Sequence, residues 1–366
     1  MSARGVLLAK LVALLALVGC MPEIDRVAEV DTVRVLAVQK TAERDGQVVG
    51  AAYARPDETV NFHMLWDRGL IEQDVERMWI TGCVNPAGDS YIGCLPFFAE
   101  NIGNLDQFRE QYVVELPAAP RPSASDTISV QMPAADVLHP AANTHEDRYA
   151  LYTVFFAACA GDIDLSLDDV SLPDGKLPIT CKRDGRTLDA DEFVVGYTSV
   201  YIYENQPNTN PFIGSLFFDS DLPITQGSLC SRTDCFTAPE PTEADRDAFC
   251  AQNPQLCMDA CPADGDIEQC PTHLLYPGVS ELDPVNSEVD SVSQRNLLEQ
   301  LTVHYHATRG LMRSDVRVIR DGTGAWNRDY GSNYYAPKDP GFVRVWAVVR
   351  DNRGGVDWIS TPLYIR

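Results

Sequence analysis

The stretch Val343-Arg-Val-Trp-Ala-Val-Val-Arg-Asp351-Asn-Arg-Gly-Gly-Val-Asp-Trp358 contains two strands and the turn between them. Its first part is rich in Val and Trp, residues that favour the pleated, half-buried surface of a sheet. Asp, Asn and two glycines follow, and these residues supply the backbone conformations of tight turns. The run that resumes after the turn is therefore predicted to pair antiparallel with the first.

Runs of the same type recur along the chain. Arg148–Cys159 is the most continuous apolar run and is predicted to be a central strand buried on both faces, although its pattern alone also allows a helix. The strand-like segments are separated by Gly, Pro and Asn, and they do not alternate with helices as in βαβ units. The sequence therefore predicts an all-β chain of antiparallel sandwiches. Strands are expected at 33–38, 59–66, 75–83, 127–132, 148–159, 193–203, 212–218, 301–308, 315–320, 342–350 and 358–365.

The stretch 343–358 resembles the last two strands of immunoglobulin-like or PKD-like domains, in which an Arg-Asp-x-Arg-Gly-Gly turn joins these strands. The opening strand followed by Pro-x-Glu-Thr-Val at 56–60 is similar to the first corner of bacterial surface modules of this type. The resemblance implies two immunoglobulin-like sandwiches in tandem, a first domain at 32–205 and a second at 206–366. It departs from antibody domains, because neither half has the Cys…Trp…Cys spacing of their core.

The boundary between the two halves is expected at Asn205-Gln-Pro-Asn-Thr-Asn-Pro211, which consists of turn-forming residues. A short repeat supports two related halves. Thr-Val-Asn-Phe-His at 59–63 is followed by Arg-Gly-Leu at 68–70, and Thr-Val-His-Tyr-His at 302–306 is followed by Arg-Gly-Leu at 309–311. The segments 149–161 and 342–355 form a second matching pair. Chance matches over so few residues also occur, so the repeat leaves duplication open.

The first nineteen residues have the basic start, apolar run and small residues of a secretory signal peptide. Leu17-Val-Gly-Cys20 resembles the lipobox of bacterial lipoproteins. The resemblance implies cleavage before Cys20, a lipid on its thiol, a tether at 20–31 and, because Asp does not follow the Cys, an outer-membrane location. An ordinary signal peptide that ends by chance in Cys, or an uncleaved anchor, remains an alternative.

The chain is strongly acidic, with a formal net charge of −24. Since no block of Lys and Arg follows Cys20, binding to nucleic acid is not expected. Attachment to the membrane is expected through the N-terminal lipid alone, since anionic membrane surfaces repel an acidic body. The expected partner is an envelope protein or polysaccharide that the sequence does not identify.

The eleven cysteines support an exported chain. With Cys20 assigned to the lipid, ten remain, an even number that permits five disulfides in an oxidising compartment. Cys83 and Cys94 flank a turn-rich loop that suits a disulfide between them, and Cys181 is expected to pair with Cys159. The other six lie in a Pro- and Asp-rich insert at 228–272, where fifteen pairings are open. These six are Cys230, Cys235, Cys250, Cys257, Cys261 and Cys270.

Calcium is the one metal that the carboxylates suggest. Asp162, Asp164, Asp168 and Asp169 lie in one acidic loop, and calcium takes six to eight oxygen ligands. The spacing does not fit an EF-hand, and an acidic loop exposed to solvent is the simpler interpretation. No cofactor is otherwise expected.

Three further patterns suggest chemistry or recognition, and each has a simpler structural interpretation. Gly-Asp-Ser at 88–90 with Asp-x-x-His at 136–139 resembles the blocks of GDS(L)-type serine hydrolases, but a cysteine-flanked turn replaces the strand-to-helix setting. His304 and His306 share one face of a strand and could bind zinc with a third ligand such as His63 or a carboxylate, or form a half-exposed polar face. The aromatic residues at 326–335 could form a recognition loop, or cap a sandwich. The sequence therefore favours a non-catalytic surface protein for binding, adhesion or envelope structure, with a calcium-dependent module or a hydrolase as alternatives.

Overall fold

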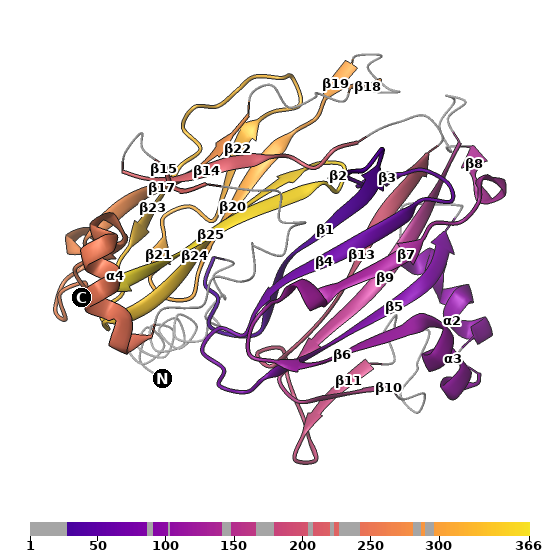
Figure 1. The fold of residues 1–366 in the computed structure, drawn as a ribbon, viewed down its shortest axis with the longest axis horizontal. Helices are drawn as coiled ribbons and strands as arrows, with labels where there is room; N and C mark the ends of the chain where they lie inside the picture. The colour runs from indigo at the N-terminus through magenta and orange to yellow at the C-terminus, as the bar shows by residue number, and fades with distance from the viewer. Residues whose placement is uncertain are drawn as a thin grey trace, which may run out of the picture.

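The computed structural model describes residues 28–85, 91–101, 103–140, 148–165, 179–203, 208–219, 223–226, 242–280, 287–289 and 296–366. Strands dominate these residues and form two pairs of facing sheets that lie side by side (Figure 1). The prediction of an all-β chain is confirmed. None of the described helices is long and apolar enough to cross a membrane.

The first sandwich uses strands up to Tyr203. One sheet has the order β2-β1-β4-β7, and the facing sheet has the order β3-β13-β9-β5-β6. The predicted central strand Arg148–Cys159 is β9, which lies between β13 and β5. The strands are β1 (Arg34–Arg44), β2 (Gln47–Gly50), β3 (Tyr53–Ala54), β4 (Thr59–Asp67), β5 (Val75–Asn85), β6 (Val113–Ala119), β7 (Thr127–Gln131), β9 (Arg148–Cys159) and β13 (Phe193–Tyr203).

The second sandwich begins at β14 and has the sheet orders β15-β14-β17-β23-β21 and β16-β25-β24-β20-β22. The stretch 343–358 forms most of β24, the turn after it and the start of β25, and the two strands pair antiparallel. The strands are β14 (Ile213–Phe218), β15 (Pro223–Gln226), β16 (Cys257–Met258), β17 (Thr272–Val279), β20 (Leu301–Ala307), β21 (Leu311–Met312), β22 (Val316–Arg320), β23 (Ser332–Tyr335), β24 (Gly341–Asp351) and β25 (Val356–Ile365).

The two sandwiches have the same strand order. In each, the first, second and fifth long strands form one sheet, and the third, fourth and last two form the other, as in immunoglobulin-like domains. In each, a two-residue strand also pairs parallel with the last strand, β3 with β13 and β16 with β25. Of the two sequence matches, 149–161 with 342–355 falls on equivalent strands, β9 and β24. The other match pairs β4 with β20, which occupy different positions in the two sandwiches.

A third apolar cluster joins the sandwiches. Val343, Val345 and Ala347 of β24 point into the core of the second sandwich, whereas Trp346 and Val348 point outward. A strand alternates its side chains between two faces, so both faces of β24 are buried. The outward residues pack against β1 and β4 of the first sandwich. This inter-sandwich cluster comprises Val30, Leu36, Ala37, Leu65, Trp346, Val348, Val356 and Trp358.

Short helices and additional strands extend the sandwiches. Helices α2 and α3 cover the outer face of β5 and β9, where Phe98 and Phe108 pack on Phe155 in a separate apolar cluster. Two more small sheets and the helix α4 complete the fold. These elements are η1 (Tyr91–Cys94), α2 (Leu95–Asn101), α3 (Leu105–Tyr112), η2 (Ala124–Asp126), η3 (Ala135–Val137), β8 (His139–Pro140), β10 (Asp162–Leu165), β11 (Ile179–Arg183), β12 (Arg186–Thr187), η6 (Glu243–Asp245), α4 (Arg246–Gln252), η7 (Pro254–Leu256), η8 (Ile267–Gln269), β18 (Ser287–Val289) and β19 (Asn296–Leu298).

Four disulfides stabilise the described part of the chain. Two of them, Cys83–Cys94 and Cys159–Cys181, are the pairs that the sequence suggested. In the insert the pairs are Cys250–Cys257 and Cys261–Cys270. Cys20, Cys230 and Cys235 lie outside the described residues. Disulfides form and persist in oxidising compartments, so the four bridges indicate a location outside the cytoplasm.

The segment predicted to link the halves is partly buried. Asn208 and Asn210 have exposed fractions of 0% and 7%. The side-chain amide of Asn210 donates to the Lys40 carbonyl at 2.9 Å, and its oxygen accepts from the Val356 amide at 3.3 Å. Turn-forming residues are common in flexible linkers, but here the side-chain amide of Asn210 satisfies backbone groups of both sandwiches, and that of Asn208 donates to the Asp351 carboxylate at 3.4 Å.

Candidate functional site

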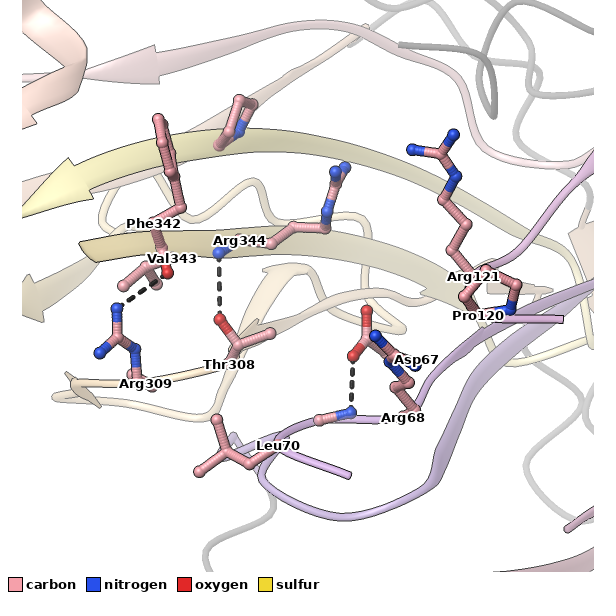
Figure 2. Close-up of a pocket in the computed structure, with 12 residues that line it drawn as sticks. Asp67, Arg68, Leu70, Pro120, Arg121, Thr308, Arg309, Phe342, Val343 and Arg344 are labelled. Atoms are coloured by element: carbon pink, nitrogen blue, oxygen red, sulfur yellow. Dashed lines mark hydrogen bonds between the residues drawn. The ribbon is translucent and has the colours of Figure 1, made fainter. Parts of the chain in front are cut away.

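A pocket of about 380 Å³ lies where the two sandwiches meet. The first sandwich contributes the turn after β4 and the end of β6, and the second contributes the end of β20 and parts of β24 and β25 (Figure 2). Pockets that bind small molecules typically measure about 300–1,000 Å³. The lining consists of Asp67, Arg68, Gly69, Leu70, Pro120, Arg121, Thr308, Arg309, Phe342, Val343, Arg344 and Pro362.

The turn after β4 forms one wall and is built around Gly69. Its φ is +62°, a left-handed conformation that favours glycine, and a Cβ there would lie 2.3 Å from the backbone carbon of Asp31. The Asp67 carboxylate accepts from the Gly69 amide at 2.7 Å. The Leu70 amide donates to the Asp31 carbonyl at 2.9 Å, so the turn also holds the segment that leads into β1.

The second sandwich forms the opposite wall with two arginines. The guanidinium of Arg309 donates to the carbonyls of Phe342 at 2.9 Å and Pro340 at 3.3 Å. The backbone amide of Arg344 donates to the Thr308 hydroxyl at 3.1 Å, and the Thr308 amide donates to the Arg344 carbonyl. These bonds join the end of β20 to the start of β24 and fix both arginines relative to each other (Figure 2).

The pocket has a positive charge in a strongly acidic protein. Four arginines and one aspartate line it, an excess of three positive charges, although the whole chain has a formal net charge of −24. The guanidinium of Arg68 donates to the Glu72 carbonyl at 2.7 Å and lies 3.7 Å from the exposed Asp74 carboxylate. A salt bridge exposed to this degree contributes little to stability.

Polar contacts between β1 and the β24–β25 turn fix the two walls relative to each other. The side-chain amide of Gln39 donates to the Val356 carbonyl and to the Asp357 carboxylate, both at 3.1 Å. The buried ammonium of Lys40 donates to the Gly354 carbonyl at 2.8 Å. Burial is the main reason why the pKa of Lys40 is lowered to about 8; the charge of Asp351 opposes this change, and that of Arg350 adds to it.

The four candidate calcium ligands are not gathered into one site among the described residues. Asp162 and Asp164 lie on β10, while Asp168 and Asp169 lie outside the described residues. The Asp164 carboxylate lies 3.0 Å from the ammonium of Lys182. In the part of the chain that the structure describes, no cluster of three or more His, Cys, Asp or Glu side chains could hold a metal ion.

The three histidines considered for zinc belong to no cluster of metal ligands among the described residues. His63 contacts the hydroxyls of Thr41 at 2.9 Å and Thr127 at 2.7 Å through its two ring nitrogens. Burial lowers the pKa of His63 to about 4. His304 and His306 do share the outer face of β20, since Val303 and Tyr305 occupy the core face.

The two remaining sequence patterns do not form a described site. Ser90 and the side chain of His139 lie outside the described residues, so the structure gives no distance between the two groups that the hydrolase alternative requires. Among the aromatic residues at 326–335, Tyr334 is fully buried, and Trp326 and Tyr330 pack against the core of the second sandwich. These three residues cap the sandwich rather than form an exposed recognition loop.

The pocket was not predicted from the sequence, although one signal pointed to it. Its arginines come from four separate segments, and none of these segments has an unusual composition. Arg-Gly-Leu at 68–70 and 309–311 is a repeated pattern, and the pocket is lined by all of the first repeat and by Arg309 of the second. Gly310 also has a positive φ, +89°, and a Cβ there would lie 2.6 Å from the Tyr334 hydroxyl.

A scan against protein families and a search of curated proteins both find no match. Among solved structures, the two tandem V-type regions of VCBP3, a V-region-containing chitin-binding protein, share 10% identity over 92% of this chain and 98% of theirs, with a TM-score of 0.24. The alpha-2-macroglobulin of E. coli shares 10% identity with a TM-score of 0.20, and the match covers 87% of this chain and 16% of that protein. The strand order of the two sandwiches is the observation that supports the immunoglobulin-like class.

Proposed function

We propose that this protein is a non-catalytic binding protein of the bacterial outer membrane, held there by a lipid on Cys20. The lipobox resemblance and the even number of remaining cysteines support the anchor. The four disulfides agree with export. The partner is an envelope polysaccharide, lipid or protein that carries negative charge.

The observation that carries the binding role is the arginine-lined pocket between the sandwiches. It is formed jointly by both, and the contacts of Gln39, Lys40 and Asn210 hold its walls in place. A preformed pocket lowers the cost of binding, because fewer groups must be ordered when the ligand arrives. Its lining side chains offer positive charge and apolar surface, both of which can bind a ligand.

Fatty-acid labelling and fractionation test the anchor. Cells that express the full chain are grown with radiolabelled palmitate, and a Cys20→Ser variant serves as the matched control. We expect label on the wild-type chain in the outer-membrane fraction and no label on the variant. A wild-type chain that is unlabelled and soluble would refute the proposed attachment.

A further inference from the structure

The segment that enters the first sandwich runs past the arginine-lined pocket. The Ala307 amide donates to the Ala28 carbonyl at 2.9 Å, and Thr308, the next residue, lines the pocket. On the other side, the turn that contains Gly69 and Leu70 holds Asp31. The chain therefore enters between the two turns that form the walls of the pocket.

This entry point places the pocket close to the proposed lipid. Only seven residues separate Cys20 from Ala28, and an extended chain spans at most about 3.6 Å per residue, or about 29 Å for the eight steps between them. A lipid on Cys20 would hold the pocket within roughly this distance of the membrane surface. A tether of this length also raises the effective concentration of headgroups at the pocket.

The charge of the pocket suits a phosphate, the anionic group that phospholipid headgroups present at a membrane surface. Arginine binds phosphate oxygens in a bidentate manner, with a strength and geometry that a neutral donor lacks. Backbone carbonyls orient the guanidinium of Arg309 without neutralising it, and Arg121 is exposed. Figure 2 shows the side chains of Arg121 and Arg344 extending in the same direction from opposite walls.

We propose that the pocket binds the phosphate of an anionic phospholipid headgroup in the leaflet that carries the anchor. The guanidinium groups of Arg121 and Arg344 bind the phosphate oxygens, and Leu70 and Phe342 contact the carbon skeleton of the headgroup. The headgroup thereby offsets the repulsion between the acidic body and the membrane, and it fixes the orientation of the sandwiches. This inference rests on the proposed function, because the membrane supplies the ligand.

Calorimetric titration of the mature chain from residue 20, with Cys20→Ser so that no lipid is attached, tests the proposal. The probes are dihexanoyl phosphatidylglycerol below its micelle concentration, inorganic phosphate and digalacturonate. We expect the phosphatidylglycerol to bind at least about tenfold more tightly than the other two, since only it supplies both phosphate and apolar groups. Equal or tighter binding of inorganic phosphate or digalacturonate would overturn the assignment to a lipid.

A matched pair of charge reversals tests the site. Arg121→Glu changes an exposed residue of the pocket, and Arg328→Glu makes the same charge change on an exposed loop that does not line it. We expect about a tenfold loss of phosphatidylglycerol affinity for Arg121→Glu, the usual contribution of a hydrogen bond between charged groups. Equal losses in both variants, or no binding by the parent chain, would overturn the proposal. Because this chain carries no lipid, these results are independent of the labelling experiment.

Discussion

Replacing the buried Lys40 by Met is expected to change how stability depends on pH. The Lys40 side chain lies between the sandwiches with an exposed fraction of 3%, and its ammonium donates to the Gly354 carbonyl at 2.8 Å. Burial lowers its pKa from 10.5 to about 8. Met has a similar length and carries no charge, so the variant removes the titration while it retains most of the packing.

The magnitude follows from the two pKa values. In the window from about pH 8 to 10.5 the unfolded chain binds the Lys40 proton and the folded chain does not, so the free energy of unfolding rises with pH. A pKa difference of one corresponds to about 1.4 kcal/mol, and the full difference therefore corresponds to about 3 kcal/mol. Below pH 8 Lys40 is charged in the folded chain as well. Burying this charge then lowers the free energy of unfolding, an effect that the hydrogen bond to Gly354 partly offsets.

Urea unfolding of both chains, followed by tryptophan fluorescence at several values between pH 7.5 and 10, measures the effect. We expect wild-type stability to rise relative to Lys40→Met across this range, by about 2–3 kcal/mol at the upper end. Lys182→Met is the control, because the side chain of Lys182 is 45% exposed. A constant difference between the wild type and Lys40→Met at every pH would refute the reasoning.

Three further predictions concern the first sandwich. Asp126→Asn should lower the free energy of unfolding by about 3–5 kcal/mol, because it leaves Arg77 buried without its carboxylate; a loss below about 1 kcal/mol in urea unfolding would contradict this. Replacing both Cys159 and Cys181 by Ser removes a bridge with a sequence separation of 22 and should cost about 3 kcal/mol, seen as a lower Tm in calorimetry, whereas an unchanged Tm would argue against it. Burial lowers the pKa of His63 from 6.5 to about 4, so the unfolded chain binds more protons in this window and stability should fall as the pH decreases through it. His63→Gln should flatten that dependence in urea titrations, and parallel curves for the two chains would rule the explanation out.

Much of the strand layout was predictable from the sequence. The predicted strands 148–159 and 193–203 match β9 and β13 residue for residue, because long β-branched and aromatic runs leave few alternatives. β6 was missed because Pro117 lies within it and its burial does not alternate. β17 was missed because it follows directly on the cysteine-rich insert and carries Pro277.

The pocket could not be predicted from the sequence of any one strand, because it depends on how the two sandwiches pack together. Residues 68, 121, 309 and 344 meet only because β1 and β4 pack against β24 and β25. Nothing in the sequence around Trp346 or Leu65 shows that these outward-facing side chains are buried against the other sandwich. The repeated Arg-Gly-Leu can be seen in the sequence. That its two arginines line one pocket follows only from the packing of two turns that are far apart in the chain.

The segment at 28–31 gives the protein a particular mechanical behaviour. The carbonyl of Ala28 accepts a backbone hydrogen bond from the second sandwich, and that of Asp31 accepts one from the first. Both sandwiches therefore hold this segment. A force applied to the chain before residue 28 would therefore act first on these backbone hydrogen bonds, which lie where the two sandwiches meet, and would reach β1 of the first sandwich only after they break.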